Sequence, residues 1–273
     1  MKVFTVLENS IKLSKFLSDK YGASMPYSTM QKLFREKDIK VDGKRVNKDI
    51  ELVKNQEVVV YFDGVEPDIK PLFNKSGILV FDKPRTITSE DFEKQVTKEF
   101  RGYQLCHRLD RNTKGLLVFG IGESLDEMLK AFKQRTIQKF YLAEVYGKLK
   151  KSSDTLTAYL VKNQEDSQVK IYNKKVDGSV KIITKYEVLE ERENTSLVKV
   201  ELITGKTHQI RAHFAHIGHF VIGDGKYGDS KFNKQYKEKR QRLTAYSLTF
   251  NFGKESVLYD LNGKTVTLEN NDF

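Results

Sequence analysis

The sequence of 273 residues contains a single cysteine, Cys106, and no long apolar run. One cysteine excludes a disulfide within the chain and fits a reducing compartment. No apolar stretch approaches the roughly 20 residues that a membrane-spanning helix needs. The first residues, MKVFTVLENSIKLSKF, have no continuous hydrophobic region of the signal-peptide type. We therefore expect a soluble cytoplasmic protein with no membrane partner.

Acidic residues are scarce relative to basic ones: 37 Asp and Glu stand against 48 Lys and Arg, and the net charge is +11. This balance favours a polyanionic partner, most simply nucleic acid, because phosphate contacts reward distributed positive charge. A basic protein without such a partner would show the same balance, so charge alone leaves both interpretations open. The apolar fraction of 38%, with 17 Phe and 13 Tyr, is typical of a folded globular chain. The length allows one or two domains.

Residues 1–63 predict a small N-terminal unit of two helices followed by short strands. Apolar residues recur at helical spacing in 11–21, and a second amphipathic pattern follows Pro26. Asp42-Gly43 lies between two short apolar runs, which predicts a hairpin with a type I′ turn. A last strand is expected at 57–62.

The remaining chain predicts a linker at 64–71 and a second unit at 72–273. The linker is marked by a glycine and two prolines, and the second unit alternates short strands with helices. Hairpins among these strands favour a mainly antiparallel sheet with helices packed on it, an α+β architecture. Strands are expected at 77–81, 115–120, 140–146, 181–189, 197–203 and 244–252. Helices are expected at 90–100 and 125–135.

The stretch CHRLDRNTKGLLVFG, residues 106–120, places Asp110 between Arg108 and Arg111 just ahead of an apolar run. An aspartate flanked by arginines is usually a surface ion pair worth about 0–1 kcal/mol. It is also what a carboxylate held ionised for chemistry would look like. The stretch by itself favours the first interpretation.

Four of the five histidines lie in TGKTHQIRAHFAHIGH, residues 204–219. This segment predicts a helix capped by Thr207 and ended by Gly218, with Arg211 on a different face from the apolar stripe. A histidine cluster also suggests a metal site and hence a metal-dependent hydrolase. No Cys pair, HExxH or acidic triplet accompanies the cluster, so packing and capping roles are favoured. No phosphate-binding glycine loop of the nucleotide-binding types is present either.

The residues His107-Arg108-Leu109-Asp110, followed by Thr113 and Gly115-Leu116, resemble the catalytic motif of the Rlu-type RNA pseudouridine synthases. Three further stretches match that family in order: ILVFDKP at 78–84, KFYLAEVYG at 139–147, and TGKTHQIRAH at 204–213 running on to Ile222-Gly223-Asp224. Together the four motifs cover about residues 72–252. The N-terminal unit resembles, less specifically, the small RNA-binding fold known from ribosomal protein S-four.

The resemblance implies a pseudouridine synthase fold and an isomerisation that needs no cofactor and no metal. It assigns Asp110 as the reacting carboxylate, which adds to the ribose or to the pyrimidine ring, or first removes a ribose proton. It assigns Arg211 as the cation that keeps this buried group charged. It places Tyr141 against the target base, either by stacking or by aiding loss of the C5 proton. Residues expected to contact the RNA are Arg108, Lys206 and His208 near the active site, and Lys32, Arg35, Lys44 and Arg45 in the N-terminal unit.

Several positions depart from the family pattern without touching this catalytic set. Lys114 and Lys206 replace a usual serine and arginine, Thr244 replaces a common histidine, and Thr86-Ile87 replaces a Gly-Leu pair.

The implied substrate is ribosomal RNA of the large subunit, with transfer RNA as an alternative, and a monomer is expected. The main alternative of another class is a non-catalytic RNA-binding or ribosome-assembly factor that has kept the fold.

Overall fold

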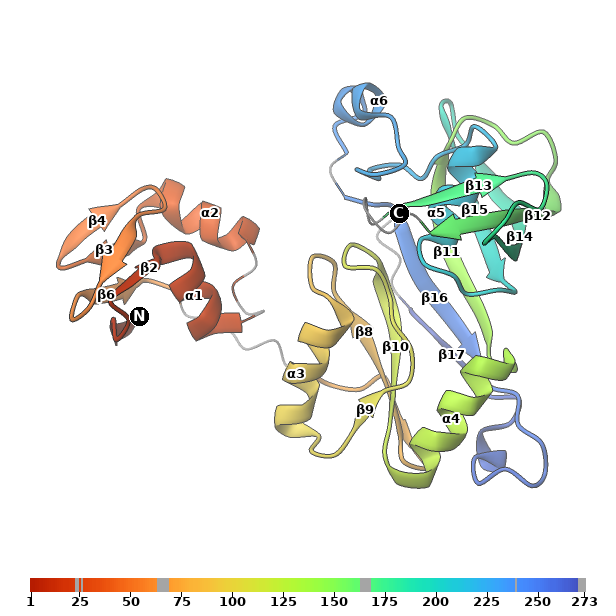
Figure 1. Cartoon of the computed structure of the whole chain (residues 1–273), viewed down its shortest axis with the longest axis horizontal. Helices are drawn as coiled ribbons and strands as arrows, with labels where there is room; N and C mark the ends of the chain where they lie inside the picture. The colour runs from red at the N-terminus through yellow and green to blue at the C-terminus, as the bar shows by residue number, and fades with distance from the viewer. Residues whose placement is uncertain (23–24, 26, 63–68, 163–167, 239, 270–273) are drawn as a thin grey trace. The chain divides into compact units, whose positions relative to one another are not determined.

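The computed structural model describes residues 1–22, 25, 27–62, 69–162, 168–238 and 240–269 (Figure 1). The chain forms two compact units, Met1–Ile69 and Lys70–Phe273. The linker expected at 64–71 falls largely on residues 64–68, which lie outside the described residues. Within the described ranges, no helix has the length and apolar character that crossing a membrane requires.

The N-terminal unit packs two helices and a four-stranded antiparallel sheet, of order β1-β6-β3-β4, around one hydrophobic core. Its elements are β1 (Lys2–Thr5), β2 (Ser10–Lys12), α1 (Leu13–Tyr21), α2 (Tyr27–Glu36), β3 (Ile39–Val41), β4 (Lys44–Val46), β5 (Glu51–Val53) and β6 (Glu57–Val60). Asp42 and Gly43 have φ of 47° and 77°, so both centre residues of the β3–β4 turn are left-handed. This confirms the predicted type I′ hairpin.

The C-terminal unit is built on an 11-stranded sheet whose main path runs β13-β12-β14-β15-β11-β16-β10-β8-β7. Its strands are β7 (Phe73–Lys75), β8 (Ile78–Lys83), β9 (Gln104–Leu105), β10 (Lys114–Gly120), β11 (Gln138–Tyr146), β12 (Ser153–Lys162), β13 (Val169–Tyr172), β14 (Val180–Glu191), β15 (Thr195–Leu202), β16 (Leu243–Thr249) and β17 (Thr265–Thr267). Its helices are α3 (Ser89–Glu99), α4 (Gly122–Gln134), α5 (Gln209–His216), α6 (Ser230–Gln235) and the short 3-10 helix η2 (Tyr259–Leu261). The predicted α+β class is confirmed.

The sheet changes direction where β10 meets β16, which pair in parallel while the neighbouring pairs are antiparallel. Gly115 lies at this junction with φ of 124°, and a Cβ there would come within 2.2 Å of the carbonyl oxygen of Ala245. Glycine is therefore required for the two strands to approach this closely. The junction positions the start of β10, directly after the loop that carries Asp110.

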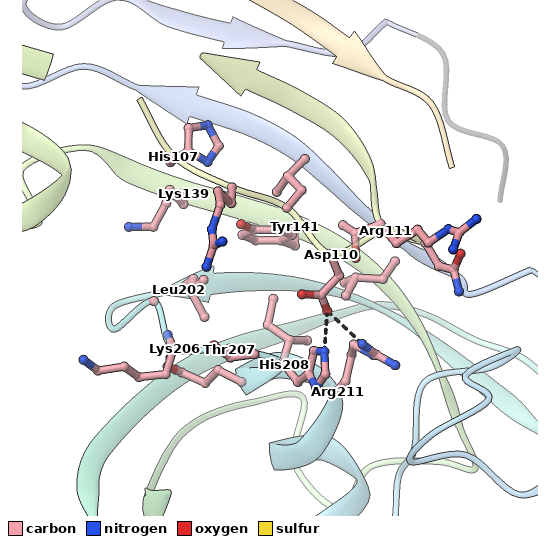
Figure 2. Close-up of a pocket in the computed structure, with 18 of the residues that line it drawn as sticks. His107, Asp110, Arg111, Lys139, Tyr141, Leu202, Lys206, Thr207, His208 and Arg211 are labelled. Carbon is pink, nitrogen blue, oxygen red and sulfur yellow. Dashed lines mark hydrogen bonds and ion pairs between the residues drawn. The ribbon is translucent and has the colours of Figure 1, made fainter. Parts of the chain in front are cut away.

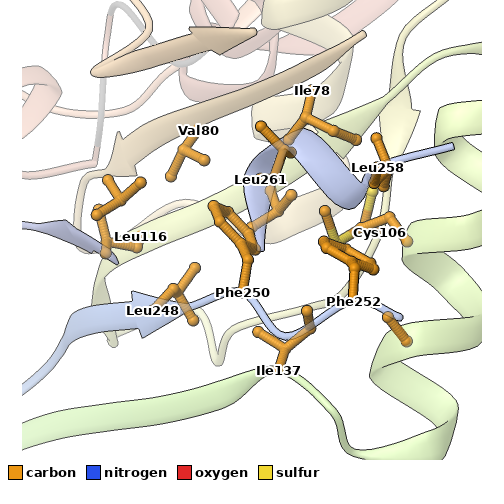
Figure 3. Close-up of a cluster of buried hydrophobic side chains, with 14 of the residues drawn as sticks. Ile78, Val80, Cys106, Leu116, Ile137, Leu248, Phe250, Phe252, Leu258 and Leu261 are labelled. Carbon is orange, nitrogen blue, oxygen red and sulfur yellow. The ribbon is translucent and has the colours of Figure 1, made fainter. Parts of the chain in front are cut away.

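A hydrophobic cluster packs between α4 and the β8–β10–β16 part of the sheet (Figure 3). Its buried members include Ile78, Val80, Leu116, Leu248 and Phe250. Cys106 is buried in the same cluster, and burial raises the pKa of its thiol to about 12. The thiol is therefore an inert packing group at neutral pH. On the other half of the sheet, α5 packs against β12, β13 and β14.

Candidate active site

A pocket of about 1100 Å³ opens in the C-terminal unit, between the 106–113 loop, β11 and the start of α5 (Figure 2). Segments more than 100 residues apart in the sequence meet here, because β10, β11 and β16 are neighbours in the sheet. The six site residues expected in this unit all line the pocket: Asp110, Tyr141, Arg211, Arg108, Lys206 and His208. The structure thus brings together what the sequence spreads over three motifs.

The loop that carries Asp110 is held on both sides by buried hydrogen bonds. Before Asp110, the Leu109 N–H donates to Ser89 Oγ (2.9 Å) and Ser89 Oγ donates back to the Leu109 carbonyl (3.1 Å). After Asp110, the Thr113 N–H donates to the Asp110 carbonyl (3.0 Å), which closes a turn. The Gln241 side chain then donates to Thr113 Oγ1 (2.9 Å). The carboxylate therefore has a fixed backbone beneath it.

Lys83 supports the same loop from the end of β8. Its Nζ is fully buried and donates to the carbonyls of Pro84 (2.9 Å), Ile87 (3.0 Å) and Arg111 (3.3 Å). Burial lowers the pKa of Lys83 to about 8, against the opposing effect of the negative charge on Asp110. The ammonium thus ties the end of β8 to the residue that follows Asp110.

Arg211 lies between two carboxylates. Its Nη1 donates to Asp110 Oδ2 (2.8 Å), while Nε and Nη2 donate to the two oxygens of Asp224 (2.6 and 2.8 Å). Burial lowers the pKa of Arg211, but the hydrogen bonds and charges of Asp224 and Asp110 outweigh it and raise the pKa above its ordinary value. The guanidinium is a permanent cation in contact with the Asp110 carboxylate.

Asp224 was not among the residues predicted for the site. It is completely buried and accepts from the N–H groups of Lys226 (2.8 Å) and Tyr227 (3.2 Å) in addition to Arg211. Burial raises its pKa, but Arg211 and these N–H groups outweigh burial and lower it. The preceding Gly223 has φ of 73°, and a Cβ there would lie 1.9 Å from the Arg240 carbonyl oxygen. A glycine is thus needed to bring Asp224 beneath the guanidinium.

His208 lies beside the Asp110 carboxylate as well, with its Nε2 3.9 Å from Oδ2 (Figure 2). Its other ring nitrogen, Nδ1, is hydrogen-bonded to the Tyr227 hydroxyl (2.9 Å). The residue has φ of 53°, so α5 begins after it. The expected cap at Thr207 was therefore wrong, because a left-handed residue separates Thr207 from the helix. Burial lowers the pKa of His208 more than the charge on Asp110 raises it, which leaves a neutral imidazole at neutral pH.

Tyr141 forms part of the pocket wall above Asp110 (Figure 2) and is 7% exposed. A register shift between Phe140 and Tyr141 in the pairing of β11 with β16 sets where this ring points. Burial raises the pKa of the phenol, and the negative charge on Asp110 raises it further. The hydroxyl therefore keeps its proton at neutral pH.

The rim and floor of the pocket carry further cations. Arg108 is 73% exposed and paired with Glu90 (2.9 Å), and Lys206 is also exposed. Lys139, which was not predicted for the site, is buried and its pKa is lowered by burial and by the nearby charge of Arg135. These groups give the pocket a positive lining that suits a phosphate backbone.

The other histidines form hydrogen bonds with protein groups. His107 accepts from the Val118 N–H (3.2 Å), and burial with the Lys139 charge lowers its pKa to about 3. His213 bonds Thr184 (3.0 Å) and His216 bonds Asn173 (2.7 Å). In the part of the chain that the structure describes, no three His, Cys, Asp or Glu residues are grouped as a metal site would need.

The sequence profile of the RNA pseudouridylate synthase family matches residues 73–216. The chain belongs to the RNA pseudouridylate synthase family. It is thus an enzyme that isomerises uridine in RNA to pseudouridine, which confirms the class predicted from the four motifs.

The relatives of this synthase include two named ribosomal large subunit pseudouridine synthase C. The one from Vibrio vulnificus (strain CMCP6) is 28% identical over 237 residues, covering 77% of this chain and 74% of the relative. The one from Pasteurella multocida (strain Pm70) is 28% identical over 294 residues, covering 96% and 90%. Among solved structures, human RNA pseudouridylate synthase domain containing 1 superposes with a TM-score of 0.64 at 24% identity, covering 74% of this chain and 84% of that one. This likeness confirms the predicted fold.

In the N-terminal unit of the synthase, the four predicted RNA contacts lie at the surface: Lys32, Arg35, Lys44 and Arg45. Lys32 is 61% exposed and lies 4.0 Å from Glu36 on α2. Arg45 lies over the ring of Tyr61, 5.2 Å from its centroid, and 3.4 Å from Asp38. Arg45 is therefore partly neutralised within the unit.

Proposed function

We propose that this synthase isomerises uridines in large-subunit ribosomal RNA and that Asp110 is its nucleophile. The observation that carries the assignment of Asp110 is its contact with Arg211, at 2.8 Å, in a pocket lined by Tyr141. The ribosomal substrate is supported by the names of the relatives, which cover most of this chain.

The reaction needs a carboxylate that is both charged and reachable. Asp110 keeps a quarter of its side chain exposed to the pocket, and the permanently charged Arg211 guanidinium lies 2.8 Å from its carboxylate. In the isomerisation, the N1–C1′ bond of the uridine breaks, the base turns, and a C5–C1′ bond forms. The C5 hydrogen leaves as a proton and N1 gains one, so no oxidant or reductant is involved. Asp110 acts by adding to the ribose or to the pyrimidine ring, or by first removing a ribose proton.

Tyr141 is proposed to lie against the turned base. Its buried ring offers a stacking surface in the pocket that Asp110 also lines (Figure 2). Because the phenol is protonated at neutral pH, it takes up the C5 proton only if it passes its own proton on in the same step. Stacking has no such requirement.

A uridine inside a helix must be flipped out to reach this pocket, at a cost of a few kcal/mol. Arg108 is proposed to fill the vacated space or to hold a neighbouring phosphate, because it is exposed at the pocket rim. Its guanidinium stacks on bases, which lysine does not do. Lys206 and His208 are proposed as further RNA contacts because they line the same pocket.

The experiment that tests the proposal uses the full chain and ribosomal RNA labelled with tritium at C5 of uridine. Large-subunit RNA is expected to release tritium, and transfer RNA is not. Mapping pseudouridines in RNA from cells with and without the gene would then identify the position. Release from transfer RNA alone would overturn the ribosomal assignment, and the absence of release from both would overturn the catalytic role of the pocket. The protein is proposed to act as a cytoplasmic monomer, which sedimentation and fractionation would test.

The N-terminal unit is proposed to bind the RNA substrate through its exposed basic residues. Removing residues 1–69 is expected to raise the Kd for RNA and to reduce its salt dependence, since each lost phosphate contact removes about 0.7–0.9 from the log–log slope. The pocket lies wholly in the other unit, so the truncated chain should still release tritium at saturating RNA. An unchanged Kd and slope would contradict the role of this unit.

A further inference from the structure

A second pocket, of about 300 Å³, lies on the C-terminal unit beside α6. It is lined by Tyr146, Phe220, Asp229, Lys231, Phe232 and Gln235. Nothing in the reaction at Asp110 uses these residues. They come from the end of β11, the segment after α5, and α6 with its N-cap residue Asp229.

The walls of this pocket are aromatic rings that contact one another. Tyr146 and Phe220 are stacked, with ring centroids 4.9 Å apart and planes at 4°. Phe232 meets Tyr146 edge-on at 4.8 Å and stacks on Tyr236 at 5.4 Å. Tyr146 and Tyr236 remain 38% and 39% exposed. Together the four rings form a platform with free aromatic surface.

The platform is fixed to the core of the unit. The Tyr236 hydroxyl donates to the buried carboxylate of Glu144 on β11 (3.2 Å). Asn233 accepts from the Gly223 N–H (2.8 Å), next to the aspartate that holds Arg211. Asp229 caps α6 by accepting from the Phe232 N–H (2.8 Å). Because these contacts exist before any ligand binds, little ordering would be needed on binding.

The polar groups around the rings favour a nucleotide. Lys231, Lys234 and Lys237 are exposed on or next to α6, and the first two lie one turn apart on the same face. The polar side chains that line the pocket include the Gln235 amide, the Asp229 carboxylate and Lys231, besides the Tyr146 hydroxyl. The amide suits the edge of a base, and the carboxylate would repel a phosphate placed inside. The arrangement fits a base in the pocket and phosphates outside it.

We propose that this pocket is a subsite for an unpaired base of the RNA substrate, which stacks on the exposed ring of Tyr146 while the flanking phosphates lie against Lys231 and Lys234. The proposal rests on the proposed function in one respect, that the RNA bound here is the substrate of the synthase. It gives Lys231 and Lys234 of α6 a role in substrate choice, away from the uridine that reacts at Asp110.

The test uses the full chain and a single-stranded RNA carrying one 2-aminopurine, whose fluorescence falls when the base stacks. Tyr146→Ala is expected to weaken binding of this RNA by about tenfold and to reduce the quenching, because one base–aromatic stack is lost. Tyr146→Phe should bind as the wild type does, since it keeps the ring. Lys231→Gln should lower the log–log salt slope by about 0.7. In the tritium assay Tyr146→Ala should raise KM and leave kcat unchanged.

Tyr259→Ala is the matched control, because Tyr259 is a 44% exposed tyrosine of the same unit outside the platform. The proposal is overturned if Tyr146→Ala binds and quenches as Tyr259→Ala does, which would leave the platform to a protein partner. It is also overturned if Tyr146→Phe loses as much as Tyr146→Ala. Failure of the wild type to release tritium would sink the proposed function instead, because the fluorescence measurement reads this pocket without turnover.

Discussion

Two loops of the synthase present a carboxylate to the same guanidinium, and they differ in almost every other respect. Asp224 is completely buried and accepts hydrogen bonds from Arg211 and from two backbone N–H groups. Asp110 is a quarter exposed, and Arg211 reaches it through a single nitrogen at 2.8 Å. One carboxylate has its oxygens occupied by the protein, whereas the other keeps an oxygen directed at the pocket.

We infer from this difference that Asp224 holds Arg211 in position, whereas Asp110 is the carboxylate that can react. A buried arginine needs a carboxylate to offset its desolvation, and Asp224 supplies this with a bidentate contact. Arg211 is then held in place whether or not Asp110 engages it. Asp110 is left free to exchange its contact with the guanidinium for bonds to a substrate. The two aspartates should therefore respond to substitution in different ways.

The largest effect is expected for Asp110→Asn, which removes the reacting charge. Turnover in the tritium-release assay should fall by at least about 10⁴-fold, as for loss of a nucleophile elsewhere. The free energy of unfolding should change by less than about 1 kcal/mol, because Asp224 still neutralises Arg211. The RNA Kd should stay within a few-fold of the wild-type value. Full turnover would remove Asp110 from the mechanism, and a large loss of stability would make it a structural residue.

Asp224→Asn should show the reverse balance. Breaking a buried ion pair by removing one partner costs about 3–5 kcal/mol, so urea unfolding should shift strongly. Turnover should fall by about 10²-fold, because Arg211 is no longer held in position, yet it should stay above that of Asp110→Asn. Asp260→Asn is the control, since Asp260 forms an exposed pair with Lys75 at 3.0 Å and should cost under about 1 kcal/mol. Equal stability of the two variants would contradict the assignment of Asp224.

The role of Asp110 could be predicted from the sequence, whereas the role of Asp224 could not. Asp110, Tyr141 and Arg211 lie in motifs that match a family. Asp224 also stands in a matched stretch, at the end of Ile222-Gly223-Asp224, but the sequence predicted no role for it. Its role depends on the path of the loop past Arg240, which Gly223 permits and which no local pattern encodes. The signal available was a glycine next to a carboxylate, 13 residues after an arginine that needs a counter-charge.

The fold shows the same limit. Strands with strong apolar runs, such as β8 and β10, were predicted within one or two residues of their bounds. β12 was missed because its sequence SDTLTAYLVK opens with polar residues, and only two of its ten residues are buried while four are partly buried. β13 has four residues, too few for a periodic signal. The parallel pairing of β10 with β16 joins segments that are far apart in the chain, which makes it a tertiary property.

The smallest effect is expected at His208, whose imidazole lies beside the Asp110 carboxylate together with Arg211. Asparagine tolerates the left-handed backbone at this position, so His208→Asn removes the imidazole without straining the chain. Losing this 3.9 Å contact between the imidazole and the Asp110 carboxylate should reduce turnover by about tenfold or less. Tyr227→Phe removes the hydroxyl that holds Nδ1 and should have a similar effect, and the double variant should fall little further than either single one.

The pH dependence of the turnover lost in His208→Asn tests whether His208 contributes a positive charge beside Asp110. Burial lowers the pKa of His208 from its ordinary value near 6.5, so the protonated fraction grows only as pH falls below that range. At about pH 7 and about pH 8 the imidazole is neutral, and the loss of turnover should be the same factor at both. A loss that grows steadily from pH 8 to pH 7 would mean that a charged imidazole contributes. In that case Asp110 would lie between two cations, His208 and Arg211. The comparison of Asp110 with Asp224 around Arg211 alone would then be incomplete.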